Sequence, residues 1–235
     1  AEYSGRPLDY YRNLRVTNPS NYLYFYDFGD YQIIGASPES LVSVKQGQVT
    51  TNPIAGTRPR GQDEREDKAL AEELLADEKE VAEHRMLVDL GRNDIGKIAQ
   101  NNSVEVTKYM EVEYFRYVMH LTSVVRGQLL PQLTAMDALK STLPAGTVSG
   151  APKIRAMKRI YELEQEKRGV YAGAIGYLSA TGDMDFAIAI RTMVLKNSRA
   201  YVQAGAGIVY DSIPTNEYQE TINKAKSMTK IGEMQ

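Results

Sequence analysis

Two pairs of glutamates are the residues of this sequence best suited to chemistry. They are Glu80 with Glu83 and Glu217 with Glu220, and in each pair the members are three residues apart. In a helix this spacing puts both carboxylates on one face. Four carboxylates from two distant segments could converge on Mg²⁺, which takes one or two carboxylates and keeps sites for water and substrate oxygens. A solvated helix face is the alternative, and the spacing alone leaves both open.

Two glycines stand inside an apolar run near the end of the chain. Gly205 and Gly207 belong to residues 203–209, which we predict to lie in a strand. Glycine weakens a strand interior, so this pair indicates either a bend or the close approach of a ligand to the backbone. Free N–H groups there could hold a carboxylate. The spacing does not fit a dinucleotide-binding loop, because a third glycine is missing.

Three further features could serve an anionic ligand or move a proton. Arg191 is predicted to lie in the middle of an apolar strand, and a buried guanidinium needs an acidic partner or an anionic ligand. The loop 53–61 carries two arginines and a threonine, so it could present these groups to an anion or simply connect two elements. His120 stands among apolar residues, where a histidine is usually structural, yet histidine is also a proton carrier near neutral pH.

Composition limits the classes of function. The 235 residues suffice for one large domain or two small ones, and 43% hydrophobic residues predict a substantial core. A net charge of −2 gives no electrostatic footprint for nucleic acid or an anionic membrane. No cysteine is present, which excludes disulfides, thiolate metal sites and a cysteine-dependent glutaminase in this chain. Since no apolar run reaches membrane-spanning length and no signal peptide is evident, we expect a cytoplasmic protein.

Hydrophobic patterning predicts an α+β fold with sizeable antiparallel sheets. Two hairpins are expected, one from residues 22–28 and 31–37 and one from residues 41–44 and 48–51. Residues 52–61 are rich in Pro and Gly and are expected to form a structured loop with no regular element. The other predicted strands are 104–109, 117–125, 174–180, 187–195 and 200–209, and the predicted helices are 8–15, 63–99, 135–142, 152–167 and 215–231.

Nearly the whole chain, from Leu8-Asp9-Tyr10-Tyr11 to the last helix, resembles the chorismate-utilising enzymes, and within them the large subunits of anthranilate synthase. The motifs that carry the resemblance are Gly35-Ala36-Ser37-Pro38-Glu39, residues 53–61, Glu83-His84-Arg85-Met86-Leu87-Val88-Asp89-Leu90, Arg92-Asn93-Asp94, Val118-Met119-His120-Leu121, Gly146-Thr147-Val148-Ser149-Gly150-Ala151-Pro152-Lys153, Gly173-Ala174-Ile175-Gly176-Tyr177 and residues 203–209. The resemblance implies an α/β sandwich of large antiparallel sheets flanked by helices. It also implies that residues 1–235 form a single chorismate-binding catalytic domain, incomplete at its N-terminus.

The resemblance implies a magnesium site and a substrate site. Glu83 and Glu220 would hold Mg²⁺, with Glu80 and Glu217 behind them, and the metal would bind the ring carboxylate of chorismate. The residues expected to bind the enolpyruvyl carboxylate or line the ring are Tyr171, Arg191, Gly205, Gly207, Gly56 and Thr57.

It also implies three residues close to the reacting atoms. Glu39 would be the general acid that protonates the departing 4-hydroxyl, so we expect it to be partly buried with a raised pKa. His120 would assist proton transfer. Thr147 would line the pocket near the attacking side.

The implied reaction is that of a lyase of tryptophan biosynthesis. Ammonia adds to chorismate at ring C2, the 4-hydroxyl leaves, and elimination of pyruvate gives anthranilate. A separate glutamine amidotransferase subunit would supply the ammonia in a hetero-oligomer.

Other activities of the family and an inactive fragment stay open. Aminodeoxychorismate synthases typically have a lysine at the position of Ala55, and alanine cannot act as a nucleophile. Isochorismate and salicylate synthases can share Ala-Gly-Thr here, and they activate water with a lysine upstream of the region where this chain begins. That region would also carry the tryptophan-inhibition site. A catalytically inactive fragment is the remaining alternative.

Overall fold

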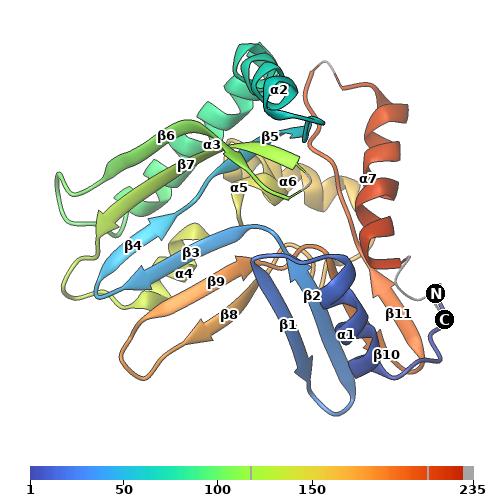
Figure 1. The fold of residues 1–235 in the computed structure, drawn as a ribbon. Coiled ribbons are helices and arrows are strands. Elements are labelled where there is room, and N and C mark those ends of the chain that lie inside the picture. The colour runs from blue at the N-terminus through green and yellow to red at the C-terminus, as the bar shows by residue number, and fades with distance from the viewer. Residues whose placement is uncertain (117, 211, 230–235) are drawn as a thin grey trace. The chain divides into compact units, whose positions relative to one another are not determined.

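The computed structural model describes residues 1–116, 118–210 and 212–229. The chain forms two compact units, each built from segments far apart in the sequence. The first unit contains Ala1–Ser40, Thr147–Ile175 and Ala187–Gln235, and the second contains Leu41–Gly146 and Gly176–Phe186. Figure 1 labels the helices and strands of both.

The first unit is built on a four-stranded antiparallel sheet with the strand order β1-β2-β10-β11 (Figure 1). Its elements are α1 (Pro7–Thr17), β1 (Tyr22–Asp27), β2 (Tyr31–Ser37), α6 (Lys153–Leu163), β10 (Thr192–Lys196), β11 (Arg199–Val202) and α7 (Pro214–Thr229). Leu14, Ile34 and Met228 are fully buried in its core. The Tyr10 hydroxyl donates to the Met228 carbonyl at 2.6 Å and so joins α1 to α7.

The second unit contains most of a seven-stranded sheet with the order β5-β7-β4-β3-β9-β8, in which β6 pairs with the other edge of β7. The strands are β3 (Ser40–Lys45), β4 (Gln48–Thr51), β5 (Ile54–Pro59), β6 (Glu105–Tyr114), β7 (Val118–Gln128), β8 (Ala174–Leu178) and β9 (Met184–Ile188). The helices are α2 (Glu64–Ala76), α3 (Glu78–Gly96), α4 (Ala135–Thr142) and the short α5 (Gly146–Ser149), which ends in the first unit. Leu74 of α2 packs with Met119 and Leu121 of β7 in a buried cluster.

The structure confirms the α+β prediction, both hairpins and helix α4 as expected. In the second hairpin Gln46 and Gly47 both have positive φ, of 50° and 78°, as a two-residue turn between twisted strands requires. The predicted helix 63–99 is divided at Asp77 into α2 and α3. Tyr117 and residues 230–231, which belong to a predicted strand and a predicted helix, lie outside the described residues.

The prediction that residues 52–61 contain no regular element is wrong, because residues 54–59 form strand β5 against β7. Because proline lacks an N–H, it disrupts a strand where a backbone donor is needed in the ladder. Here Pro53 precedes the strand and Pro59 is its last residue, so neither interrupts it. Gly56, at a φ of +70°, stands between Ala55 and Thr57, where the register shifts as at a β-bulge.

Two predicted strands are shorter than expected. Residues 187–195 do not form one strand, because β9 and β10 belong to different sheets and the chain turns between them. Arg191 lies in that turn with a φ of +49°, not in a strand. Strand β11 ends at Val202, so Gly205 and Gly207 lie in irregular backbone.

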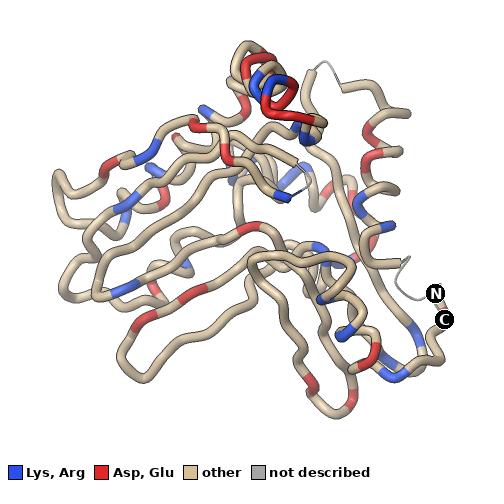
Figure 2. Tube along the Cα trace, viewed as in Figure 1, with Lys and Arg blue, Asp and Glu red and all other residues tan. Residues whose placement is uncertain are grey.

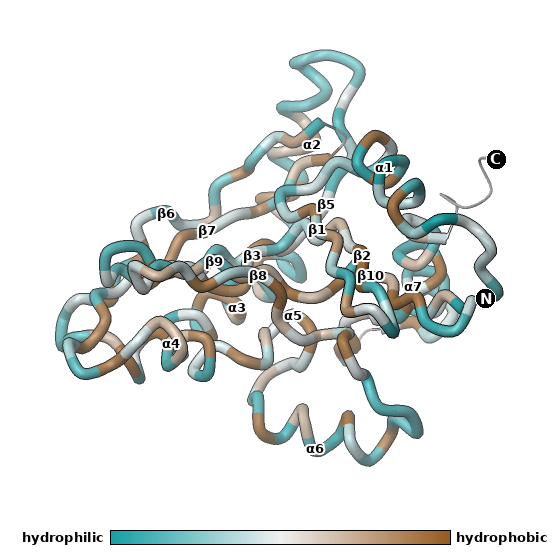
Figure 3. Tube along the Cα trace, turned by 90° about the horizontal axis from the view of Figure 1, so that it is seen from below, coloured by the Kyte–Doolittle hydropathy of each residue, from teal (hydrophilic) through white to brown (hydrophobic). Residues whose placement is uncertain are grey.

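Helices α6 and α7 of the first unit carry many polar residues. None of the residues of α6 is buried, and hydrophobic and hydrophilic residues are mixed along it (Figure 3). Acidic and basic residues are distributed along α7 (Figure 2). Of the helices in the described ranges, none combines the length and the apolar character needed to cross a membrane.

Asp77 fixes the start of α3, the helix that carries Glu80 and Glu83. Its carboxylate accepts the N–H groups of Lys79 and Glu80 at 3.1 Å and pairs with Arg58 of β5 at 2.8 Å. The hydrogen bond from the Glu80 backbone, followed by that from Arg58, lowers the pKa of Asp77. The first turn of α3 is therefore fixed against β5.

We predict that Asp77→Ala destabilises the protein by roughly 1–2 kcal/mol, because it removes a helix cap. Asp77→Asn keeps a cap but loses the ion pair with Arg58. A carboxylate with a lowered pKa contributes stability above its unfolded pKa of about 3.9 and loses it as the pH falls through the folded pKa. Urea unfolding should therefore show a difference in unfolding free energy between the wild type and Asp77→Asn at pH 7 that begins to narrow below about pH 4 and vanishes only below the folded pKa.

Asp63→Asn is the matched control. Asp63 caps α2 by accepting the Glu66 N–H at 2.8 Å, and it forms no ion pair within the described residues. A difference for Asp77→Asn that does not narrow at all between pH 7 and pH 3, or an equal difference for Asp63→Asn, would contradict the role of the ion pair.

Candidate active site

In the second unit, β5 and β7 bring Gly56 and Thr57 beside His120. Thr57 and His120 are register partners, and His120 Nδ1 lies 2.9 Å from the Gly56 carbonyl oxygen and 3.1 Å from Thr57 Oγ1. A carbonyl oxygen can only accept, so this geometry assigns the proton of the neutral ring to Nδ1. The Phe115 ring packs edge-on at 5.4 Å between centroids. Nε2 is then the nitrogen with a lone pair that can accept a proton.

The first glutamate pair lies next to the same segment. A Cβ added to Gly56 would lie 3.2 Å from Oε2 of Glu80, so the carboxylate packs closely on this glycine. Burial, then the charges of Glu83 and Asp77, raise the pKa of Glu80. Glu80 and Glu83 are half-buried and form no ion pair within the described residues. Such a pair suits a bound cation.

The two arginines of residues 53–61 have partners inside the second unit. Arg58 pairs with Glu73 at 2.9 Å and with Asp77, and Arg60 makes a forked contact with Asp67. Both arginines thus hold α2 and the start of α3 against β5. The arginines of residues 53–61 therefore connect elements of the fold, which is one of the two roles that the sequence left open for this segment.

In the first unit, Glu39 follows β2 and is held at both its backbone and its carboxyl group. Its carbonyl oxygen accepts the Ile188 N–H at 3.0 Å, and its carboxyl group is hydrogen-bonded to Thr147. Burial raises the pKa of Glu39 to about 7, against smaller lowering effects of Thr147 and Lys224. The expected partial burial and raised pKa are confirmed. Near neutral pH this carboxyl group is present in both forms, as a general acid needs.

The first unit also holds the candidate carboxylate-binding residues. The Arg191 guanidinium is half-buried and makes no ion pair with a described residue, and burial lowers its pKa. Tyr171 is close to the irregular glycine segment: a Cβ at Gly205 would lie 2.7 Å from the Tyr171 hydroxyl. A Cβ at Gly207 would meet no atom of the described residues within 4 Å. A half-buried guanidinium without an acidic partner favours an anionic ligand.

Lys224 is a site residue that the sequence reasoning missed. Its Nζ lies 2.5 Å from Glu220 Oε1 and donates to the Gly205 carbonyl at 3.2 Å, and its charge acts on Glu39. Glu220 is therefore already paired through one carboxylate oxygen. The signal was available, because Lys224 follows Glu220 by four residues in a predicted helix, and such pairs meet on one face.

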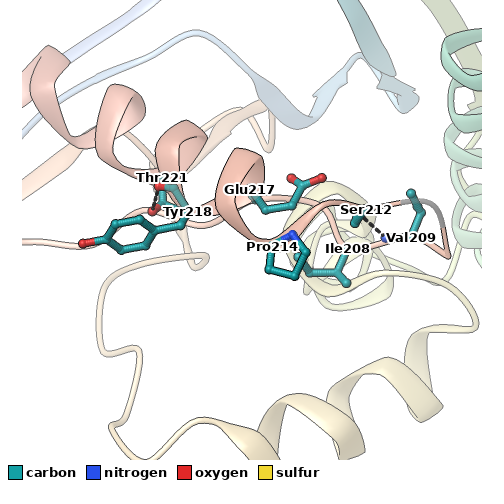
Figure 4. Close-up of a pocket in the computed structure, with 8 residues that line it drawn as sticks. Ile208, Val209, Ser212, Pro214, Glu217, Tyr218 and Thr221 are labelled. Atoms are coloured by element: carbon teal, nitrogen blue, oxygen red, sulfur yellow. Dashed lines mark hydrogen bonds between the residues drawn. The ribbon is translucent and has the colours of Figure 1, made fainter.

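A largely apolar pocket of about 350 Å³ is lined by the irregular backbone that follows β11 and by the start of α7 (Figure 4). It is lined by Ala206, Ile208, Val209, Ser212, Pro214, Glu217, Tyr218 and Thr221. The Val209 N–H donates to Ser212 Oγ at 3.0 Å, which fixes the loop before α7. Glu217, one of the four candidate metal-site carboxylates, is the charged group of the lining. The pocket was not foreseen, because residues 206–209 were predicted to lie in a strand.

The candidate residues are thus distributed over both units. Glu80, Glu83, Gly56, Thr57 and His120 belong to the second unit, whereas Glu39, Thr147, Tyr171, Arg191, Gly205, Gly207, Glu217 and Glu220 belong to the first. In neither unit do three or more described His, Asp or Glu side chains gather as a metal-binding group. A magnesium site that uses both glutamate pairs stays a prediction.

The contact between Gly205 and Tyr171 yields a test. Gly205→Ala should destabilise the protein by roughly 1–3 kcal/mol, because the added methyl group meets the Tyr171 hydroxyl. Adding Tyr171→Phe removes that hydroxyl and should restore most of the loss. Gly207→Ala is the control and should be nearly neutral in urea unfolding. A double variant as unstable as Gly205→Ala alone would contradict the contact.

Comparison with known proteins identifies the family. A model of the chorismate binding enzymes matches residues 1–230. The chain is 64% identical over 233 residues to anthranilate synthase component 1 of Lactococcus lactis subsp. lactis (strain IL1403), a match that covers 99% of this chain and 51% of that protein. It spans about half the length of the curated relatives it matches.

Solved structures agree with that assignment. Anthranilate synthase component I from Streptococcus pneumoniae TIGR4 matches with a TM-score of 0.91 and 83% identity, over 97% of this chain and 51% of that one. A putative 2,3-dihydroxybenzoate-specific isochorismate synthase from Bacillus anthracis matches with a TM-score of 0.83 and 29% identity, over 99% of this chain and 63% of that one. From the family match and these relatives it follows that this chain belongs to the chorismate binding enzymes.

Proposed function

We propose that this chain carries the chorismate site of an anthranilate synthase large subunit, a lyase of tryptophan biosynthesis. The observation that carries the proposal is Glu39, a carboxyl group whose burial raises its pKa to about 7, in the unit that also holds Arg191, which makes no ion pair with a described residue. A carboxylic acid that titrates near neutral pH can protonate a hydroxyl leaving group, and a guanidinium can bind a carboxylate. Both properties suit a substrate with carboxylates and a hydroxyl leaving group. The identity to anthranilate synthase component 1 of Lactococcus lactis and Pseudomonas aeruginosa supports this choice within the family.

Arg191 binds the enolpyruvyl carboxylate in this proposal. Its planar guanidinium can donate two parallel hydrogen bonds to a carboxylate. Tyr171 and the backbone N–H groups of Gly205 and Gly207 complete the donors around it. Lys224, which is already held by Glu220 and the Gly205 carbonyl, adds a positive charge near Glu39.

Glu39 and His120 carry the protons. A nitrogen–carbon bond forms at ring C2 while the C4–oxygen bond breaks, Glu39 gives its proton to the leaving hydroxyl so that water departs, and the new ammonium group loses a proton to solvent. The C3–oxygen bond then breaks, the enolpyruvyl group takes up a proton and leaves as pyruvate, and the ring loses its C2 proton. His120 accepts that proton at Nε2, because its Nδ1 donates to the Gly56 carbonyl. Gly56 and Thr57 line the ring, and Thr147 orients Glu39 through their hydrogen bond.

Mg²⁺ is the cofactor in this proposal, with Glu83 and Glu220 as ligands and Glu80 and Glu217 behind them. The first pair suits a hard cation, since the pKa of Glu80 is raised in part by the charge of Glu83 and neither Glu80 nor Glu83 has an ion-pair partner among the described residues. Glu220 has one carboxylate oxygen paired with Lys224, and its other oxygen would bind the metal. When bound, Mg²⁺ supplies positive charge for the ring carboxylate.

Ammonia is the nucleophile, and a glutamine amidotransferase subunit is its source. The chain has no cysteine, so it cannot carry a thiol-dependent glutaminase. Ala55 offers no nucleophile at the position where aminodeoxychorismate synthases typically have lysine. Isochorismate formation is the second candidate, favoured by the likeness to the Bacillus anthracis protein. A cytoplasmic location accompanies the proposal.

We predict that a protein of the relatives' full length converts chorismate to anthranilate when Mg²⁺ and ammonium are present. Mass spectrometry and anthranilate fluorescence identify the product. Glutamine should replace ammonium only when an amidotransferase subunit is added. Glu220→Gln should abolish turnover with little change in folding, since an exposed carboxylate contributes little stability. Isochorismate as the product in the presence of ammonium would reject the proposal.

The role of Glu39 gives a second test. A general acid works in its protonated form, so kcat should fall as the pH rises through about 7. Glu39→Gln should slow the reaction by roughly 10²–10⁴-fold and remove that limb of the profile. Glu166→Gln, at an exposed position of the same unit, is the control. An unchanged profile for Glu39→Gln would show that another group provides the proton.

A further inference from the structure

Arg168 joins two segments of the first unit that carry candidate site residues. Its Nη1 donates to the Val148 carbonyl at 2.6 Å, and its guanidinium carbon lies 5.5 Å from the centre of the Tyr171 ring. Val148 follows Thr147, which is hydrogen-bonded to Glu39. One cation thus contacts both the segment that orients Glu39 and the ring of a candidate substrate-binding residue.

Arg168 is itself held on two sides. Its Nε lies 2.9 Å from Glu164 Oε2 and its Nη2 lies 2.5 Å from Glu164 Oε1, a forked ion pair at the end of α6. Glu164 is fixed in turn, because its N–H donates to the Ile160 carbonyl at 2.8 Å. The pair raises the pKa of Arg168 and lowers that of Glu164. The guanidinium is thereby anchored to the backbone of α6.

The backbone at Arg168 adds a second link to Tyr171. The Tyr171 N–H donates to the Arg168 carbonyl at 3.1 Å, and Gly169, with a φ of +59°, lies inside this turn. Arg168, whose guanidinium lies over the face of the Tyr171 ring, therefore precedes Tyr171 by three residues in one hydrogen-bonded turn. A guanidinium over an aromatic face gains both electrostatic attraction and stacking.

We propose that Arg168 is a positioning residue for the reaction, and that it sets the Thr147–Val148 segment and the Tyr171 ring in one arrangement without touching the substrate. The inference rests on the proposed function, since it assigns Tyr171 to substrate binding and Thr147 to the support of Glu39. Arginine is specified because one planar group makes a forked ion pair, donates to a carbonyl and covers a ring. Lysine, a point charge on a flexible stem, cannot do all three.

The test compares Arg168→Gln and Arg168→Lys with the wild type in a protein of the relatives' full length. Arg159→Gln is the matched control, because Arg159 also pairs with a glutamate, Glu162 at 2.6 Å, and its side chain is 63% exposed. The measurements are kcat and KM for chorismate with Mg²⁺ and ammonium, the melting temperature, and amide hydrogen exchange at residues 146–150 and 170–174.

We expect Arg168→Gln to lower kcat/KM by roughly 10–100-fold, with a rise in KM, since small misplacements of binding groups have effects of this size. Arg168→Lys should recover less than half of the loss, whereas Arg159→Gln should behave as the wild type. Hydrogen exchange should become faster in both named segments of Arg168→Gln without global unfolding.

Kinetic constants of Arg168→Gln equal to those of the wild type would overturn the proposal. So would full rescue by Arg168→Lys, or a loss of activity that only follows a lower melting temperature. Failure of the proposed function gives a different result, because the wild type would then form no anthranilate. In that case the exchange measurement still decides whether Arg168 holds the two segments together, and unchanged exchange in Arg168→Gln would overturn that role.

Discussion

The first unit depends on how the chain leaves β9 and enters β10. These strands belong to different sheets, and residues 188–191 make the connection. Ile188 donates to the Glu39 carbonyl, Ala189 exchanges hydrogen bonds with Ala172 and Gly173, and the Arg191 carbonyl accepts the Ala36 N–H. One short connection therefore holds the backbone of the candidate acid, the residue after Tyr171 and the candidate carboxylate-binding arginine.

Ionisable groups that make no ion pair with a described residue occur among the candidate site residues of both units. Burial pushes the pKa of Glu39 up and that of Arg191 down, so each charged form is less favoured than in water. Glu80 is raised by its neighbours as well as by burial. By contrast, Arg58 and Arg60 are fully engaged with carboxylates and stabilise the elements that carry the site. In the proposed function, the first set of groups binds ligand or carries protons, whereas the two arginines stabilise the fold.

Patterns of local sequence predicted most of the elements, because hairpins and amphipathic helices are determined over short distances. The hairpin around Gly29 and helix α4 needed only a turn signal and hydrophobic periodicity. The failures at Gly56, Arg191 and Gly205 have a common cause. At each the backbone departs from the conformation its neighbours favour, through a bulge, a change of sheet or an early strand end, and tertiary contacts decide all three.

The candidate site residues came from the family resemblance more than from spacing. From spacing alone, the glutamate pairs could equally belong to solvated helix faces and His120 could be a structural core residue. Spacing gave no reason to select Glu39. The structure adds the burial that raises the pKa of Glu39 and the contacts of Lys224 with the Gly205 carbonyl and of Arg168 with the Val148 carbonyl. The partners of Glu39, Thr147 and Lys224, lie more than a hundred positions from it, and a single sequence does not pair them. The contacts of Lys224 and Arg168 span 19 and 20 positions across irregular backbone, where no periodic pattern predicts them.

The most direct test of whether Arg191 binds a carboxylate of the substrate is to compare the affinities of Arg191→Lys and the wild type for chorismate. Isothermal titration in the presence of Mg²⁺ and without ammonium measures binding without turnover. Lysine keeps the charge and accepts the same backbone conformation but lacks the planar fork, so Kd should rise by at least about tenfold, which is 1.4 kcal/mol. An unchanged Kd would make Arg191 a structural residue and would contradict the proposed site.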